Sequence, residues 1–148
     1  MRLIPIRQEE TENTVLINNA LCRDTVFMTM DFYKRAGYKE PWIGYIIHNG
    51  EEFVGAGGFK GVPINGCVEI AYGTFENYTQ KGVGTTICNL LVRLATEADS
   101  SLIITARTMP GSIASEKILL KNAFHLMGIV DDPEDGNVNE WIYNKVDD

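Results

Sequence analysis

The sequence predicts an α/β fold of one domain, residues 1–148, built on a mixed β-sheet. Asn-Gly and Asp-Gly dipeptides separate runs of strand-forming residues, and such dipeptides are the strongest short signals for β-hairpins. An apolar strand pattern at Cys67–Thr74 is followed by an amphipathic helix over 82–98 and a short apolar strand over 102–108. A strand–helix–strand unit makes its two strands parallel neighbours, so parallel and antiparallel strands should share the sheet.

The first third of the chain predicts one strand and two helical segments. Apolar side chains alternate over residues 2–7, which is typical of an opening strand. Residues 9–38 carry apolar side chains at helical spacing, with a break near 22–24. Gly37 ends the second helical segment, and Pro41 prevents any further helix.

Three turns organise the strands, because both central residues of an Asn-Gly or Asp-Gly turn can adopt positive φ. The predicted hairpins are 42–48 with 52–59 through Asn49-Gly50, 52–59 with Cys67–Thr74 through Asn65-Gly66, and 126–130 with 138–146 through Asp135-Gly136.

The last predicted helix covers residues 113–124, with Ser112 at its N-cap. The predicted order of elements is therefore β-α-α-β-β-β-α-β-α-β-β, with no linker or internal repeat.

Composition excludes several classes of protein. The net charge is −7, which disfavours nucleic-acid binding because phosphate neutralisation needs a basic face. No apolar run approaches the ~20 residues of a membrane span, and the N-terminus lacks a signal-peptide core. Cys22, Cys67 and Cys88 form no C-x-x-C pair, so we expect reduced, buried thiols in a cytoplasmic protein.

A strand, a short loop and Gly82-Val83-Gly84 at a helix start predict an anion site. The first amides of a helix have no intrahelical partner, and the helix dipole adds partial positive charge there. Glycines let a pyrophosphate approach the backbone closely. A dinucleotide fingerprint requires a third glycine where Ile87 stands, and the Gly-Lys-Ser/Thr of a Walker loop is absent. These differences disfavour the interpretation that the chain is a nucleotide-binding domain of another family.

The window Thr79-Gln80-Lys81-Gly82-Val83-Gly84 resembles motif A of the GNAT superfamily, the acetyl-CoA-dependent N-acetyltransferases. That motif has the pattern Q/R-x-x-G-x-G/A after a strand and at the start of a long helix. Both glycines match. Thr79 stands at the Gln/Arg position, with Gln80 one place later.

A second stretch resembles the ribosomal-protein-alanine acetyltransferase-like branch, whose pattern is roughly T-x-P-x-N-x-x-S-x-x-V-L-x-K-x-G-F. The positions that fit are Thr108, Pro110, Ser115, Ile118, Leu119, Lys121 and Phe124. Ser112 stands at the Asn position and Ala123 at the Gly position. The resemblance covers nearly the whole chain.

The resemblance implies a GNAT fold of about seven strands and about four helices, in which a splayed parallel pair of strands holds acetyl-CoA. It implies no metal, and a monomer or homodimer. The implied pantetheine contacts are the backbone groups of Gly73, Thr74 and Phe75. The implied contacts of the rest of the cofactor are Thr79, Gln80, Lys81, Gly82, Val83, Gly84, Thr85 and Ser112.

The implied reaction is direct attack of a neutral amine on the acetyl thioester in a ternary complex. Glu69 is the candidate general base, since a carboxylate inside the apolar run 68–72 can take a proton directly or through water. The alternative is an outward-facing residue on a half-buried strand. Ser115 is the candidate acid or thiolate stabiliser, because Leu119 fills the place where many relatives carry tyrosine. The alternative for Ser115 is a first-turn serine that satisfies helix amides.

The acceptor is expected to be a small-molecule or peptide amine. A protein N-terminus, a polyamine, an amino acid and an antibiotic amine all stay open. Five aromatic residues are candidates for an acceptor pocket, with core packing as the alternative for each: Tyr33, Tyr38, Trp42, Trp141 and Tyr143. The rival function is a non-catalytic acyl-CoA-binding or regulatory module on the same fold.

Overall fold

A computed structural model describes residues 1–79 and 82–145. Gln80 and Lys81, two of the candidate cofactor contacts, lie outside the described residues. The elements are β1 (Arg2–Pro5), η1 (Glu10–Asn13), α1 (Thr14–Ile17), α2 (Arg23–Ala36), β2 (Gly44–His48), β3 (Phe53–Phe59), β4 (Cys67–Thr74), η2 (Glu76–Tyr78), α3 (Val83–Ala98), β5 (Ile103–Thr108), α4 (Ile113–Lys121), β6 (Phe124–Asp132) and β7 (Gly136–Tyr143). Apart from the two short 3-10 helices, this is the predicted order.

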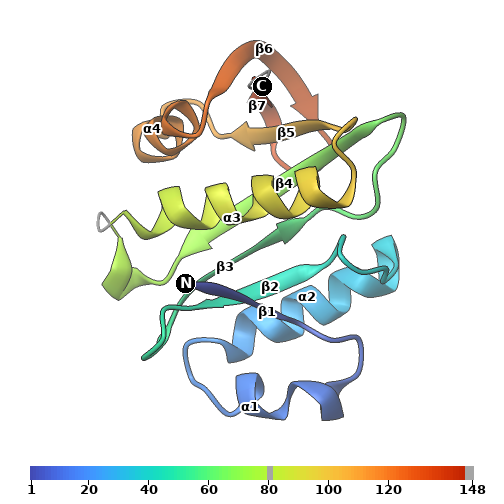
Figure 1. The fold of residues 1–148 in the computed structure, drawn as a ribbon, viewed down its shortest axis with the longest axis vertical. Helices are drawn as coiled ribbons and strands as arrows, with labels where there is room; N and C mark the ends of the chain where they lie inside the picture. Colours follow the sequence, from blue (N-terminus) through green and yellow to red (C-terminus); the bar gives the residue numbers. More distant parts are fainter. Residues whose placement is uncertain (80–81, 146–148) are drawn as a thin grey trace.

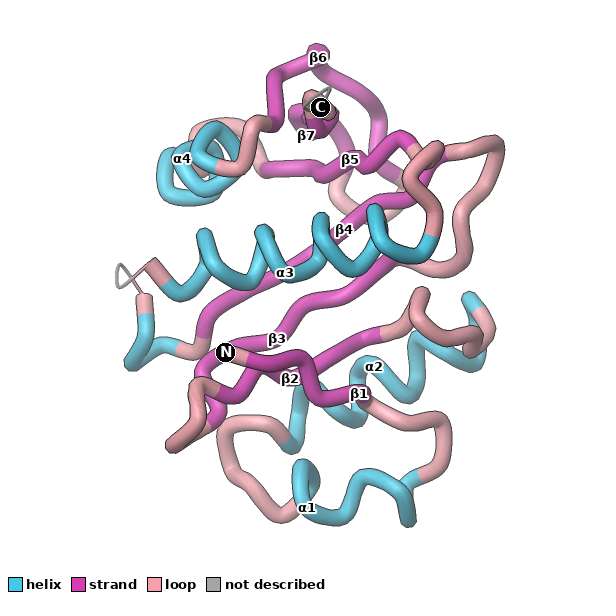
Figure 2. The backbone as a smooth tube through the Cα atoms, in the orientation of Figure 1, coloured by secondary structure: helices cyan, strands magenta, loops and turns pink. Residues whose placement is uncertain are grey.

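Seven strands form one sheet in the order β1-β2-β3-β4-β5-β7-β6. The predicted parallel pair is confirmed, because Val68 of β4 is in register with Ile104 of β5. The other neighbours are antiparallel, and the three predicted hairpins are β2–β3, β3–β4 and β6–β7. Figures 1 and 2 show α3 running along β3 and β4, with α4 beside the start of α3.

Helices cover both faces of the sheet. Gly55 and Gly57 of β3 let α3 pack closely. A Cβ on Gly55 would lie 2.8 Å from Ile87, and a Cβ on Gly57 would lie 3.0 Å from both Ile87 and Leu91. On the other face, the methyl group of Thr29 in α2 would lie 2.7 Å from a Cβ on Gly44 of β2. The core therefore consists of side chains from both faces of the sheet, and Ile87 and Leu91 are fully buried in it.

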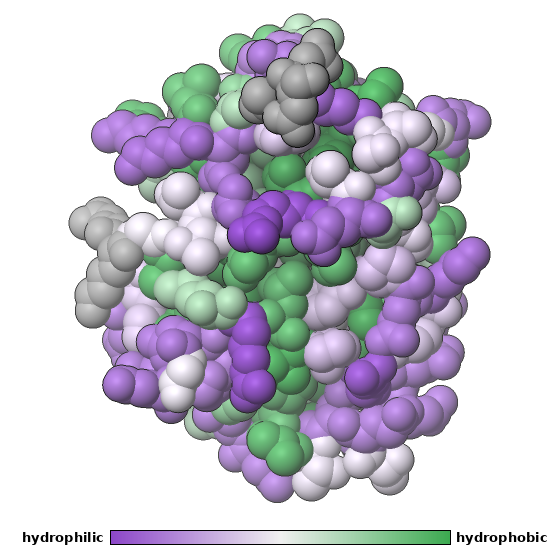
Figure 3. Space-filling model, in the orientation of Figure 1, coloured by the Kyte–Doolittle hydropathy of each residue, from purple (hydrophilic) through white to green (hydrophobic). Residues whose placement is uncertain are grey.

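The predicted boundaries differ from the structure at several elements: α1 is limited to Thr14–Ile17, β7 covers Gly136–Tyr143, and the last helix is too long in the prediction. The helix predicted over 113–124 ends at Lys121, and β6 already begins at Phe124. Ala123 has a φ of 64°, which a right-handed helix cannot accommodate, so the chain turns there into the strand. Polar side chains cover most of the face seen in Figure 3, and apolar side chains show between them in a band along its middle.

Candidate functional site

The parallel strands β4 and β5 separate toward their C-terminal ends. Their last register pair in the described residues is Ile70 with Ala106. Beyond it, β4 continues to Thr74 and β5 to Thr108. On its other side β4 stays paired with β3 as far as Thr74, opposite Gly55. One edge of β4 is thereby left open at its end, as the resemblance to a splayed pair implies.

The hydrogen bonds between β3 and β4 show which peptide groups face this opening. Lys60 N–H donates to the Glu69 carbonyl, and Phe75 N–H donates to the Val54 carbonyl. Peptide groups of successive strand residues point to opposite sides, so residues 69, 71, 73 and 75 face β3. The amide and carbonyl groups of Tyr72 and Thr74 therefore face the opening.

This geometry corrects part of the expected pantetheine contacts. Thr74 is placed as expected, but the peptide groups of Gly73 lie on the β3 side. The peptide groups of Phe75 are not available to the pantetheine arm either, because its N–H donates to the Val54 carbonyl and its carbonyl accepts from Tyr78 N–H. Tyr72, whose peptide groups do face the opening, was not among the expected residues, because the sequence does not show which alternate residues of β4 bond to β3.

The start of α3 lies beside the open edge and carries free amides. The first helical bond runs from Thr86 N–H to the Gly82 carbonyl, which leaves the amides of Val83, Gly84 and Thr85 ahead of it. Among residues 1–79 and 82–145 no side chain caps the helix, and its first turn contains no acidic residue. These features fit an anion.

The two glycines of this helix start have different roles. Gly82 has a φ of 77°, a conformation that side chains rarely adopt, and a Cβ there would project into open space. A Cβ on Gly84 would instead lie 2.6 Å from Ile118 of α4 and 3.7 Å from Thr74 of β4. Gly84 thus lets α3, α4 and the open edge of β4 meet. Thr79 is less available, since its hydroxyl donates to the Glu76 carbonyl at 3.2 Å.

Helix α4 presents Ser115 and Ile118 on one stripe. Ile118 contacts the start of α3, and Asn122 Nδ2 donates to the Thr85 carbonyl at 3.1 Å. Ser115 is half-buried in the first turn. Ser112 occupies the N-cap position as predicted, but its side chain makes no cap hydrogen bond. Leu119 is fully buried, so the position at which many relatives have tyrosine belongs to the core here.

Glu69 lies in a cluster of charged side chains on the face opposite α3. Its carboxylate oxygens are 3.2 Å from Lys60 Nζ and 3.7 Å from Arg107 Nε. Arg107 also contacts Asp132 at 2.8 Å and Glu140 at 3.1 Å. The Glu69 side chain keeps 19% of its surface exposed, so solvent reaches it. Long-range pairing of this kind, between four strands and the residue that follows β3, left no signal in the sequence.

Asp132 holds the β6–β7 turn to this cluster. The Arg107 guanidinium, followed by the N–H groups of Glu134 and Asp135, lowers the pKa of Asp132 to about 2. Because the pKa is lowered, the ionised Asp132 carboxylate stabilises the fold at pH values above its ordinary pKa of 3.8. This stabilisation is lost as the pH falls toward 2.

Asp132→Asn is therefore expected to lower the free energy of unfolding at pH 7, and the loss should disappear as the pH falls toward 2. Denaturant unfolding across this pH range measures it. Asp131→Asn, at the exposed neighbour, is the control and should have little effect. A deficit that stays constant from pH 7 to pH 2 would contradict the proposed role of the Asp132 charge.

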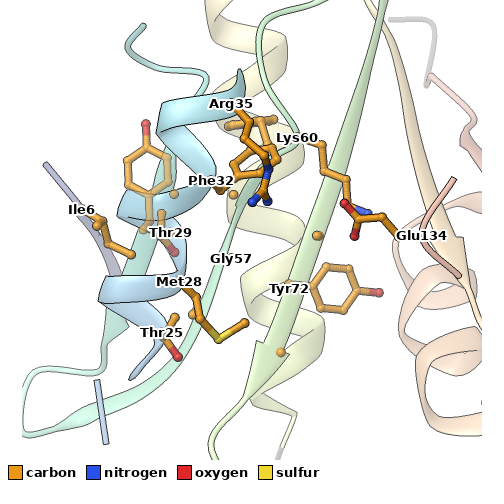
Figure 4. Close-up of a pocket in the computed structure, with 17 residues that line it drawn as sticks. Ile6, Thr25, Met28, Thr29, Phe32, Arg35, Gly57, Lys60, Tyr72 and Glu134 are labelled. Carbon is orange, nitrogen blue, oxygen red and sulfur yellow. The ribbon is translucent and has the colours of Figure 1, made fainter. Parts of the chain in front are cut away.

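A cleft of about 430 Å³ lies on the α2 side of the sheet. Figure 4 shows side chains of α2 on one wall, with Tyr72 on the side of β4 and Arg35, Lys60 and Glu134 at one end. Because Ala71, Tyr72 and Gly73 also line it, the cleft reaches the part of β4 that borders the opening.

The aromatic residues expected to line an acceptor pocket lie elsewhere. Tyr33 is buried and donates to the Ile6 carbonyl, with Tyr38 packed on its ring. Trp42 packs on Phe59, and Tyr143 packs on Phe124. Trp141 Nε1 donates to Thr108 Oγ1 inside the core. The alternative of core packing is the correct one for these side chains.

The cysteines are free, and Cys22 and Cys88 are fully buried. Burial raises the pKa of Cys22 to about 11 and that of Cys88 to about 12, so neither is a reactive thiolate at neutral pH. Burial, followed by the neighbouring Cys88 of α3, raises the pKa of the Tyr72 hydroxyl, so the Tyr72 ring lies on the α3 side of the sheet.

Among residues 1–79 and 82–145, no group of three His, Cys, Asp or Glu side chains is placed to hold a metal ion. No described helix has the length and apolar character needed to cross a membrane.

The chain matches one family model, described as an acetyltransferase (GNAT) domain, over residues 4–125. No curated protein matches it. Similar solved structures include a spermidine N-acetyltransferase chimera from Vibrio cholerae and hSSAT, at 10% identity and a TM-score of 0.69, covering 97% of this chain and 95% of that chain. The aminoglycoside acetyltransferase AAC(6')-Ib in complex with coenzyme A matches at 18% identity and a TM-score of 0.67, covering 97% and 93%.

A third structure, the ribosomal-protein-S5-alanine acetyltransferase from Vibrio fischeri, matches at 13% identity and a TM-score of 0.62. It covers 81% of this chain and 68% of that chain. At such identities the likeness concerns the fold, with its seven-stranded mixed sheet and parallel β4–β5 pair.

Proposed function

This chain belongs to the GNAT acetyltransferase family, and on that premise we propose that it transfers an acetyl group from acetyl-CoA to a primary amine by direct attack in a ternary complex. The observation that carries the proposal is the open edge of β4 at Tyr72 and Thr74, directly beside the uncapped amides of α3. A neutral polar edge next to an anion site fits an amide-containing arm that ends in a pyrophosphate.

The cofactor-binding residues follow from this arrangement. The amides of Val83, Gly84 and Thr85 would receive the pyrophosphate, with Gly82 leaving room for it. Tyr72 and Thr74 would hydrogen-bond the pantetheine arm in place of a paired strand. Thr79, Gln80, Lys81 and Ser112 are proposed as peripheral contacts, on the resemblance to motif A and to the alanine-acetyltransferase pattern.

Acetyl-CoA, when bound, supplies an activated thioester. The chain must hold its carbonyl, accept a proton from the amine and assist departure of the thiolate. The Tyr72 N–H faces the opening and is proposed to donate to the carbonyl oxygen as negative charge develops. Glu69, solvent-accessible on the same strand, is proposed to take the amine proton through water. Lys60 and Arg107 hold its carboxylate in position.

The acceptor is proposed to be a protein N-terminus or a small amine, and the location to be cytoplasmic. Resemblance to the ribosomal-protein-alanine acetyltransferase-like branch supports a protein N-terminus. The solved structures of similar fold include enzymes named for spermidine and for aminoglycosides as well. The rival, a non-catalytic acyl-CoA-binding module, shares the cofactor site but requires no proton acceptor.

An assay of free CoA released from acetyl-CoA in the presence of an amine panel tests this proposal. The panel contains peptides with free N-termini, amino acids, monoamines, spermidine and an aminoglycoside. Release that depends on an amine, together with an acetylated amine detected by mass spectrometry, supports the enzyme. Binding of acetyl-CoA without transfer to any amine would favour the binding module.

Ser115→Ala is expected to lower kcat more than CoA affinity, because a contact with the leaving thiolate forms chiefly in the transition state. Stopped-flow turnover and calorimetry with CoA measure the two quantities. Ser100→Ala is the control, at an exposed serine between α3 and β5 that is not part of the proposed site. A stability loss of about 1 kcal/mol in Ser115→Ala with intact turnover would show a structural serine instead.

A further inference from the structure

The cleft on the α2 side carries information about the acceptor, and the inference drawn from it rests on the proposed function. The cleft ends at Ala71 and Gly73, where β4 borders the opening for the thioester. An amine that attacks the thioester must approach from this side, because α3 covers the opposite face of β3 and β4. The rest of the acceptor then lies between α2 and the sheet.

The floor of the cleft is flat because its residues are small. Ala56 is in register with Gly73, and Gly58 is in register with Ala71. All four line the cleft. A floor without side chains beyond Cβ leaves room for a bulky group to lie on the sheet.

The wall opposite this floor is one stripe of α2, in which Met28 and Phe32 are the large apolar side chains. Thr25, Thr29 and Arg35 complete the stripe. Met28 is 73% exposed, and its flexible thioether suits contact with apolar groups of different shape. Phe32 adds an aromatic face, over which the Arg35 guanidinium lies 5.7 Å from the ring centroid. The body of the acceptor would therefore meet apolar carbon on both sides.

The charged side chains of the cleft are more basic than acidic. Those that line it are Arg35, Lys60 and Glu134. They lie together at one end (Figure 4). The nearby carboxylates Glu69, Asp132 and Glu140 are ion-paired with Lys60 and Arg107, so they are not spare partners for the ammonium groups of a ligand.

A polycation fits such a cleft poorly. Each additional ammonium group needs a carboxylate partner to offset its desolvation, and like charges facing each other across a contact cost further free energy. Glu134 is the one carboxylate among the described residues that line the cleft, and a single carboxylate cannot serve several ammonium groups. An apolar body gains free energy from every part of its surface that the floor and wall cover.

We propose that the acceptor is a monoamine on an apolar alkyl or aryl body, and not a polyamine or an aminoglycoside. The reacting nitrogen lies at Ala71–Gly73, and the body lies between Met28, Phe32 and the small-residue floor. Both a small amine and the N-terminus of a peptide with an apolar first residue satisfy this chemistry.

Calorimetry on the CoA-saturated protein tests the proposal without requiring turnover. Phenethylamine and a phenylalanine-initiated peptide represent the two sources of the same chemistry, and spermidine represents the polycation. At physiological salt, at least about tenfold tighter binding of either apolar amine than of spermidine is expected, a difference of about 1.4 kcal/mol. Equal or tighter binding of spermidine would overturn the proposal.

These titrations, combined with the assay of CoA release and acetylation, separate this inference from the proposed function. Apolar amines that bind but are not acetylated would leave the inference standing and contradict the enzyme. Acetylation of spermidine in preference to the apolar amines would leave the enzyme standing and contradict the inference.

Met28→Glu places a carboxylate in the wall of the cleft. It should lower the affinity for phenethylamine relative to spermidine by at least about fivefold, because it replaces apolar contact by a partner for an ammonium group. Ile64→Glu is the control, since Ile64 is 69% exposed in the turn between β3 and β4 and lies outside the cleft. An unchanged affinity ratio in folded Met28→Glu would contradict the assignment of the cleft.

Discussion

Gly82→Glu is expected to lower the affinity for CoA by at least about tenfold, or about 1.4 kcal/mol, while the fold is retained. The carboxylate would stand beside the uncapped amides of Val83 and Gly84, where the pyrophosphate is proposed to bind. The positive φ of 77° adds backbone strain of order 1 kcal/mol, but a Cβ meets no atom within 4 Å. Calorimetry with CoA and thermal unfolding measure the two effects.

Gly66→Glu is the matched control for this experiment. Gly66 also has a φ of 77° and open space around its missing Cβ, but it lies in the turn between β3 and β4. The two variants should lose similar stability, and only Gly82→Glu should lose CoA affinity. Unchanged CoA affinity in folded Gly82→Glu would remove the start of α3 from the cofactor site.

Glu69→Gln is expected to lower kcat on the order of a hundredfold, the usual size of a general-base contribution. The substitution preserves shape and removes the basic oxygen. Steady-state rates across pH, with CoA affinity measured in parallel, provide the readout.

Glu140→Gln is the control that separates a loss of catalysis from the effect of removing one negative charge beside Arg107. Glu140 contacts the same Arg107 from β7, but it lies on a strand that does not border the opening. Its replacement should change stability by a similar amount and leave kcat within about twofold. If Glu69→Gln keeps its rate and pH profile, the proton acceptor is water or another group, and Glu69 serves only to hold Lys60 and Arg107.

Much of the fold was predictable because short-range signals determined it. Asn49-Gly50, Asn65-Gly66 and Asp135-Gly136 specified turns through their tolerance of positive φ, and Gly50, Gly66 and Gly136 do adopt it. The parallel β4–β5 pair followed from the length of α3 between two apolar strands. The predicted end of α4 failed because positive φ at Ala123 has no reliable residue signature outside glycine and asparagine.

The site was less predictable because it depends on contacts distant in sequence. The glycines identified the start of α3, but the peptide groups that face the opening depend on how β4 pairs with β3, which placed Tyr72 where Gly73 and Phe75 were expected. Tyr33 and Trp141 were candidates for the acceptor pocket because they are aromatic, but both are buried in the core. The wall of the cleft comes instead from exposed Met28 and half-buried Phe32, which on a helix have no distinguishing pattern.

The opening between β4 and β5, together with the start of α3, is proposed to hold acetyl-CoA. A crystal structure of the protein with CoA tests this most directly. The pyrophosphate should lie within hydrogen-bond distance of the amides of Val83, Gly84 and Thr85, and the pantetheine arm should bond to the peptide groups of Tyr72 and Thr74. A cofactor bound elsewhere, or bound here with its arm outside the opening, would contradict the claim.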